Sequence, residues 1–275
     1  MSSIQGKIGR VLTGPDMPTL TVAFSTRGAR ALGLAAEAWP AAPGLGFLVL
    51  AQEPEAPPVA AHLAALAARP DVSVVRLATT GLARSRNAAL DAARGEILLV
   101  ADDDVAHPPG AYAGIRRFFA ENPGLDLLVG RSLDPDGRPR KRPLPRRKPL
   151  TRLNAARASS HEIALRLGPV RARGLRFDEG FGVGAGTEAS LGEEYVFLAD
   201  CLAAGLNGVH DPLPVSVHPH ESSGFVWEGE GQARARALVL ARVFGRAAPP
   251  VRFAFALKNL RRFASVADLR TFLRG

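Results

Sequence analysis

The sequence predicts an α/β fold, a mixed and mostly parallel sheet flanked by helices, with a helical tail at the carboxyl end. Two observations favour this class. Short apolar runs rich in β-branched residues alternate with alanine- and leucine-rich stretches through the first half of the chain. Proline and glycine separate these runs. Strands that alternate with helices are typical of βαβ units, whose strands run parallel.

The elements of the first half follow from this alternation. Turn residues such as Pro43-Gly44 and Asn122-Pro123-Gly124 end one element before the next begins. The expected elements, in order, are strand 20–25, a helix to about residue 38, strand 45–51, helix 59–68, strand 72–77, helix 82–94, strand 97–101, helix 111–120 and strand 125–133.

The pattern changes after residue 133. Residues 138–152 hold eight Lys and Arg, four prolines and no acid. We expect an extended or mobile loop there, either solvated or closing over an anionic ligand. Order then returns with a strand at 158–166, a bent glycine-rich segment at 180–186, a helix from 191 to about 204 and a proline-containing edge strand at 207–217.

The tail, residues 225–275, is basic and is expected to form two helices divided at Pro249-Pro250. In the second helix, apolar residues such as Phe253 and Leu257 recur at helical spacing among Arg and Lys. This helix either packs on its own domain or lies on an anionic lipid surface.

Composition narrows the classes of protein. The net charge of +9 favours anionic partners. The single cysteine, Cys201, excludes an internal disulfide and a multi-cysteine metal site. The first 16 residues lack the apolar segment of a signal peptide, and no run approaches the roughly 18 apolar residues of a membrane span. We expect a cytoplasmic protein, with contact at the inner face of a membrane as an option through the basic tail.

An acidic cluster follows the fourth expected strand. Asp102, Asp103 and Asp104 come directly after the apolar run 97–101. Three adjacent carboxylates are costly at the end of a buried strand unless a cation or donor neutralises them. Residues i and i+2 of a strand point to one side, so Asp102 and Asp104 could face one Mg²⁺ or Mn²⁺ ion. The alternative is a solvated acidic turn before the next helix.

Polar residues also follow the first two strands, Ser25, Thr26 and Arg27 after the first and Gln52 after the second. Ligands of parallel sheets bind beyond the carboxyl ends of the strands. The sequence therefore predicts one ligand site formed by these residues and the acidic cluster.

Residues 81–96, Gly-Leu-Ala-Arg-Ser-Arg-Asn-Ala-Ala-Leu-Asp-Ala-Ala-Arg-Gly-Glu, followed by an apolar strand and the three aspartates, resemble the family 2 glycosyltransferases of GT-A fold. Phe177-Asp178-Glu179-Gly180-Phe181-Gly182, Gly192-Glu193-Glu194 and His218-Pro219 are similar to the acceptor half of bacterial members that build capsule or cell-wall polysaccharides. The resemblance spans about 18–224. It implies a catalytic domain at 1–224, with a nucleotide-sugar half at 18–135 and an acceptor half at 153–224, before the tail at 225–275.

The resemblance implies transfer of a sugar from a nucleotide-diphosphate donor, most often a UDP-sugar, to a hydroxyl of a glycan or lipid-linked acceptor, by an inverting, metal-dependent reaction. Asp104 would bind Mn²⁺ or Mg²⁺ directly, and Asp102 would contact the ribose or the metal through water. His218 would touch the metal or the diphosphate. Metal-binding aspartates suit such a reaction because the departing diphosphate gains negative charge.

Further roles are implied residue by residue. Ser25, Thr26 and Arg27 lie where the family binds base and ribose, and Asp103 stands beside the metal ligands. Gln52 stands where many relatives carry an acid near the uracil, which leaves base specificity open. The residues expected at the nucleotide or diphosphate from the helix start are Arg84, Arg86 and Asn87.

The acceptor hydroxyl needs a general base. Inverting members typically use an Asp after a Glu, and here Glu194 fills that position, with Glu193 as the alternative. Alternatively, the two glutamates only stabilise the amino terminus of a helix through its dipole.

Two other functions remain alternatives. A sugar-1-phosphate nucleotidyltransferase shares the architecture but needs a glycine-rich basic signature after the first strand, which residues 25–30 match poorly. A non-catalytic nucleic-acid- or membrane-binding protein fits the charge. However, the chain lacks the interleaved aromatic residues that stack on bases, so we expect no nucleic-acid partner.

Overall fold

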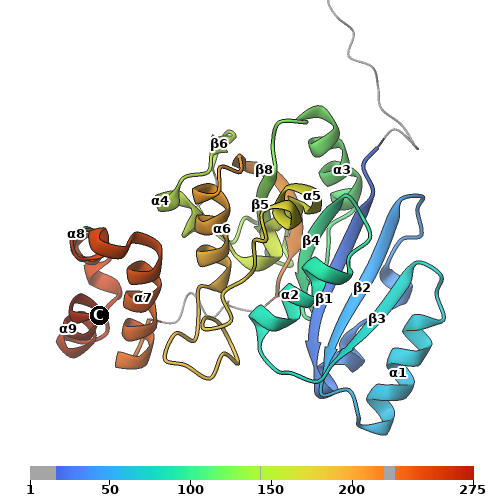
Figure 1. The fold of residues 1–275 in the computed structure, drawn as a ribbon, viewed down its shortest axis with the longest axis horizontal. Helices are drawn as coiled ribbons and strands as arrows, with labels where there is room; N and C mark the ends of the chain where they lie inside the picture. The colour runs from blue at the N-terminus through green and yellow to red at the C-terminus, as the bar shows by residue number, and fades with distance from the viewer. Residues whose placement is uncertain (1–16, 143, 220–226) are drawn as a thin grey trace, which may run out of the picture.

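The computed structural model describes residues 17–142, 144–219 and 227–275. An eight-stranded sheet runs through the molecule in the order β3-β2-β1-β4-β7-β5-β8-β6 (Figure 1). The strands are β1 Leu20–Arg27, β2 Leu45–Gln52, β3 Val72–Leu77, β4 Ile97–Asp102, β5 Leu127–Leu133, β6 Lys148–Pro149, β7 Ile163–Arg166 and β8 Gly208–Val217. Strands β1 to β4 pair in parallel, and β7 joins the two halves as an antiparallel strand between β4 and β5. This confirms the expected α/β class.

Helices cover both faces of the sheet. They are α1 Pro57–Ala67, α2 Leu82–Ala92, α3 Ala111–Glu121, α4 Arg152–Ala155, α5 Leu167–Ala172, α6 Glu193–Ala203, α7 Glu230–Phe244, α8 Ala248–Lys258 and α9 Val266–Arg274. Alternate residues of β1 divide between two cores: Val22 and Phe24 pack with α1 and α3, whereas Ala23 packs with α2 and α6. This period of two, with both sets buried, is what a central parallel strand requires.

Some expected elements differ in the structure. The segment after β1 forms two short 3₁₀ helices, Gly28–Gly33 and Ala36–Ala38, in place of one α-helix. Gly28 takes a φ of +52°, which turns the chain sharply at the strand end. The strand expected at 158–166 begins only at Ile163, because a 3₁₀ turn capped by Ser159 and Glu162 precedes it.

Strand β8 is not at the edge of the sheet, because β6 pairs with its first residues, Lys148 opposite His210. Its two prolines follow this pairing, and Pro214 faces Arg131 of β5 at a shift in register. The prolines thus lie where the ladder is interrupted, which is where a strand tolerates a missing N–H.

The basic segment 138–152 is attached to the fold at several points. Lys141 donates to Glu162 at 2.6 Å, and Arg147 donates to Asp211 at 2.7 Å. Paired carboxylates elsewhere in the chain therefore fix part of a segment that the sequence predicts to be a mobile loop.

The carboxyl-terminal region contains three helices where two were expected. Helix α7 ends before Pro249 and Pro250, and these prolines fall in the first turn of α8, where a proline needs no hydrogen-bonded N–H, so the chain does pass from one helix to the next there; α9 is the additional helix. Phe255 of α8 stacks on Trp227 and contacts the tilted ring of Phe272 in α9, which contributes to the contact between α8 and α9. Among the helices that the structure describes, none has the length and apolar character needed to cross a membrane. The expected domain boundary at 224 lies outside the described residues.

Candidate functional site

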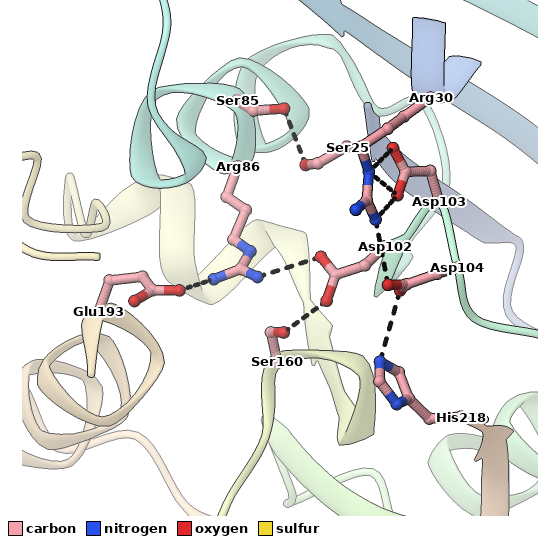
Figure 2. Close-up of polar contacts among 10 residues, drawn as sticks. All are labelled: Ser25, Arg30, Ser85, Arg86, Asp102, Asp103, Asp104, Ser160, Glu193 and His218. Atoms are coloured by element: carbon pink, nitrogen blue, oxygen red, sulfur yellow. Dashed lines mark hydrogen bonds and ion pairs between the residues drawn. The ribbon is translucent and has the colours of Figure 1, made fainter. Parts of the chain in front are cut away.

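The carboxyl ends of β1, β4 and β8 and the amino ends of α2 and α6 meet in one region (Figure 2). Strands β1 and β4 are parallel neighbours with Ser25 opposite Asp102, which brings the first strand end beside the acidic cluster. The predicted residues that gather here in Figure 2 are Ser25, Arg86, Asp102, Asp103, Asp104, Glu193 and His218.

Arg30 provides the cation for two of the three aspartates. Its Nε lies 2.9 and 3.0 Å from the two carboxylate oxygens of Asp103, and its Nη2 lies 3.0 Å from Oδ2 of Asp104. Thr26 also donates to Asp103 at 2.7 Å. The Asp103 side chain is 5% exposed, whereas that of Arg30 is 61% exposed. These contacts raise the pKa of Arg30, chiefly through its hydrogen bonds to Asp103.

Asp104 also faces His218, with Nε2 of the histidine 3.4 Å from Oδ1 of the aspartate. The hydrogen bond with His218 holds the pKa of the Asp104 carboxyl well below its usual range, and Arg30 adds to this effect. Asp104 is therefore a carboxylate at neutral pH, with one oxygen toward each partner.

Asp102 has a different set of partners. Its Oδ1 lies 3.2 Å from Nη2 of Arg86, and its Oδ2 accepts a hydrogen bond of 3.0 Å from Ser160. Burial opposes ionisation of Asp102, but Arg86 and the other partners, Ser160 among them, together outweigh it and the pKa is lowered. Strand β4 ends at Asp102, so Asp104 lies in the following turn. Residues i and i+2 share a side only within a strand, so strand geometry does not direct Asp102 and Asp104 toward the same point.

Arg86 connects the acidic cluster to α6. Its guanidinium is almost fully buried and pairs with Asp102 on one side and with the buried Glu193 on the other. Burial disfavours the charge of Arg86, yet the surrounding carboxylates raise its pKa. Its Nε has no hydrogen-bond partner among the described residues. A buried arginine between two carboxylates fixes the relative positions of β4 and α6.

Glu194 follows directly in the first turn of α6 and is partly exposed. Burial of its carboxyl, together with the adjacent negative charge of Glu193, raises the pKa of Glu194 to about 8, while Arg86 acts in the opposite direction. A carboxyl group with a pKa near the working pH is well suited to exchange a proton with a substrate.

Three predicted donor-binding residues are held by hydrogen bonds within the protein. Gln52 is buried and makes two hydrogen bonds with the backbone of Gly81, at 3.0 and 3.3 Å. Asn87 does the same with the backbone of Phe177, at 3.0 and 2.8 Å. Arg84 pairs with Glu179 at 3.1 Å. The contacts of Asn87 and Arg84 position the start of α2 against the acceptor half of the sequence, and those of Gln52 position it against the end of β2.

The remaining predicted residues lie at the end of β1. Ser25 is buried and accepts a hydrogen bond of 2.8 Å from Ser85 of α2. Arg27 is exposed and pairs with Glu53 at 2.7 Å beyond the end of β2. Arg27 is thus directed toward the neighbouring strand end.

The sequence did not single out Arg30, Ser160 or His161. His161 stacks on His218, with ring centroids 4.9 Å apart and planes inclined by 17°. Burial lowers the pKa of His161 to about 4, so the ring is neutral at pH 7. The Ser159–Glu162 capping box was the available sequence signal for this turn, which carries Ser160 to Asp102.

A divalent ion fits this donor set in part. The described residues contain no group of three or more His, Cys, Asp or Glu side chains arranged to hold a metal. Nevertheless, the 3.4 Å between the Asp104 oxygen and the His218 nitrogen is close to the separation of two adjacent ligands on an octahedral ion. Mg²⁺ commonly binds through one or two protein ligands and takes the others from phosphates and water. Asp104 supplies one carboxylate, and Nε2 of His218 lies beside it.

Comparison with known proteins agrees with the sequence motifs. Residues 54–182 match the model of Glycosyl transferase family 2. No curated protein matches the chain significantly. Among solved structures, residues 1–349 of TarS from S. aureus superpose with a TM-score of 0.65 at 15% identity, over 93% of this chain and 78% of that one. The TarS complex with UDP-GlcNAc gives 0.65 at 13% identity, over 93% and 79%, and the complex with UDP gives 0.62 at 16%, over 90% and 72%. These likenesses show the GT-A fold.

Proposed function

We propose that this chain, whose residues 54–182 match the model of Glycosyl transferase family 2, transfers a sugar from a UDP-sugar to a hydroxyl of a glycan or lipid-linked acceptor, with inversion and with the help of Mn²⁺ or Mg²⁺. The TarS structures similar in fold to this chain include complexes with UDP and UDP-GlcNAc, which supports a UDP-sugar as donor.

The observation that carries the proposal is that one buried side chain connects the acidic cluster expected at the donor to the glutamates expected at the acceptor. Arg86 pairs with Asp102 at the end of β4 and with Glu193 in α6, next to Glu194. A donor site needs positive charge to hold a diphosphate, and an acceptor site needs a base. The contacts of Arg86 hold these two functions beside one another.

Glu194 is our choice for the base. As the acceptor oxygen attacks the anomeric carbon, the bond from that carbon to the diphosphate oxygen breaks and Glu194 accepts the hydroxyl proton. Its raised pKa supports this role, because a more basic carboxylate holds the proton more firmly. Glu193 is committed to the ion pair with Arg86, so it is the weaker candidate.

Asp104 and His218 would hold the divalent ion. When bound, the ion neutralises negative charge on the departing diphosphate. Arg30 pairs with Asp103 and with Oδ2 of Asp104, whereas Oδ1 of Asp104 faces His218, so the ion would bind on the Oδ1 side. The Arg30 guanidinium is largely exposed and could then contact a diphosphate oxygen.

A thermal-shift panel of nucleotide sugars, with and without Mn²⁺, tests the proposal. We expect one class of donor to raise the melting temperature, because a ligand that binds only the folded state stabilises it. The shift should disappear when the metal is chelated. A panel without stabilisation by any nucleotide sugar or nucleoside diphosphate would contradict the proposal.

A further inference from the structure

Exposed apolar side chains concentrate on the carboxyl-terminal helices. The described part of the chain exposes eight large hydrophobic side chains, and five of them lie between residues 253 and 273. These five are Phe253, Leu257, Leu260, Val266 and Leu273, with exposed fractions from 36% to 64%. A cluster of this kind marks an interaction surface more often than scattered single residues do.

The apolar residues of α8 divide between two faces. Ala256 is buried, and Phe255 stacks on Trp227 and contacts Phe272 of α9. Phe253 and Leu257, four residues apart, are exposed. The fold therefore already has its own apolar contact on this helix, and the second apolar face is not needed to pack α7, α8 and α9 together.

The charges on the same region are almost all positive. Residues 248–275 contain six Lys and Arg and a single acid, Asp268. Asp268 is 3% exposed and lies in the first turn of α9, where its N–H bonds the Ser265 hydroxyl. The surface formed by residues 253–274, here called the tail surface, therefore combines exposed Phe and Leu with cations and shows solvent almost no carboxylate.

We propose that the tail surface docks on a membrane that contains anionic lipid. Exposed leucines and phenylalanines would enter the boundary of the acyl chains, while Lys258, Arg261 and Arg270 would contact lipid phosphates. A protein partner would need acidic side chains placed opposite these cations, whereas an anionic lipid surface presents phosphates across its whole area. Single-stranded nucleic acid fits less well too, since its bases stack on exposed aromatic rings and this surface offers one, Phe253.

The tail surface is connected to the candidate site through α7. This helix packs on both α8 and α9 and also on α6, whose first turn carries Glu193 and Glu194. Val239 of α7 lies so close to Gly192, just before α6, that a Cβ there would come within 2.7 Å of it. Docking would thus hold the acceptor side of the site near the lipid surface, which suits a lipid-linked acceptor. This last point rests on the proposed function; the docking itself does not.

Sedimentation with lipid vesicles tests the proposal without any use of transfer activity. The full chain is incubated with vesicles of phosphatidylcholine alone or mixed with phosphatidylglycerol, and the bound fraction is measured. We expect binding only to the anionic vesicles, weakening with salt because surface charge interactions are screened.

Two variants separate the contribution of the apolar side chains to vesicle binding from that of the basic side chains. One replaces Phe253, Leu257 and Leu260 with serine, and the other replaces Lys258, Arg261 and Arg270 with glutamate. The glutamate variant should lower binding about tenfold or more, given roughly 1 kcal/mol for each basic residue near the lipid surface. The serine variant should lower binding as well, because it removes the apolar side chains that would enter the acyl boundary. Matched controls are Leu153→Ser and Arg117→Glu, exposed residues outside the tail. These should bind as the original chain does, and melting curves check that all variants fold.

Several results would overturn the proposal. One is a chain that stays in solution with anionic vesicles at low salt, and another is a tail variant that binds as well as its control. A third is self-association, measured by light scattering, that the serine substitutions abolish while vesicle binding is absent. That result would assign the tail surface to a second copy of the chain.

Discussion

At the scale of single residues, positive and negative side chains alternate across the site. Arg30 pairs with Asp103 and Asp104, and Arg86 pairs with Asp102 and Glu193. The three aspartates therefore do not form one cation-binding group in this structure. Glu194 lies next to Glu193, and burial together with the negative charge of Glu193 keeps the pKa of Glu194 high despite the opposing effect of Arg86. This asymmetry between neighbouring glutamates separates a fixed structural charge from a group that can exchange a proton.

Glu194→Gln should bind donor normally but release nucleoside diphosphate slowly, by a factor of about 10² to 10⁴, because the amide cannot accept the proton. In the original chain the rate should rise with pH to a midpoint near the pKa of about 8, since only the ionised carboxylate acts as base. Steady-state rates across pH check both points. Glu188→Gln, an exposed carboxylate in the preceding loop, is the matched control. A Glu194→Gln variant with the original rate would move the base elsewhere.

At the scale of elements, the glycine-rich segment 180–186 packs against the start of α2 and the first turn of α6. Leu82, at the start of α2, donates to the carbonyl of Val183 at 2.9 Å. A Cβ on Gly182 would lie 2.5 Å from Oε2 of Glu193. The segment therefore holds the start of α2 and the first turn of α6 together, which keeps Arg86 within reach of Glu193.

Gly182→Ala should disturb this arrangement, whereas Gly186→Ala serves as its control. Both glycines have positive φ, so each alanine should cost about 1–2 kcal/mol of folding free energy. A Cβ on Gly186 meets open space, but one on Gly182 displaces Glu193. We expect only Gly182→Ala to lower the free energy of unfolding by about 1 kcal/mol more, and only this variant to lower the transfer rate. Chemical denaturation and rate assays compare the two; equal effects would mean that Glu193 does not depend on this contact.

At the scale of the whole molecule, the sequence predicts the architecture better than the site. The alternating apolar runs place β1 to β5 within two residues of their observed limits, because each buried strand and helix carries its own periodicity. Arg30, Ser160 and Lys141 could not be found in this way. Each acts on a residue at least 21 positions away, and such pairs depend on how the sheet brings distant segments together. For the same reason, the sequence does not reveal that the side chains of Gln52 and Asn87 form hydrogen bonds with backbone groups of other loops.

The proposed reaction depends most on a divalent ion held at Asp104 together with the donor diphosphate. Electron paramagnetic resonance of Mn²⁺ measures this directly, because the signal of the free ion decreases on binding. We expect UDP and the original chain together to remove the free signal, Asp104→Ala to restore most of it, and the exposed control Asp136→Ala to behave as the original. If Asp104→Ala and the original chain bound Mn²⁺ and UDP equally, or if UDP bound unchanged with the metal chelated, a metal ion held by Asp104 at the diphosphate would be contradicted.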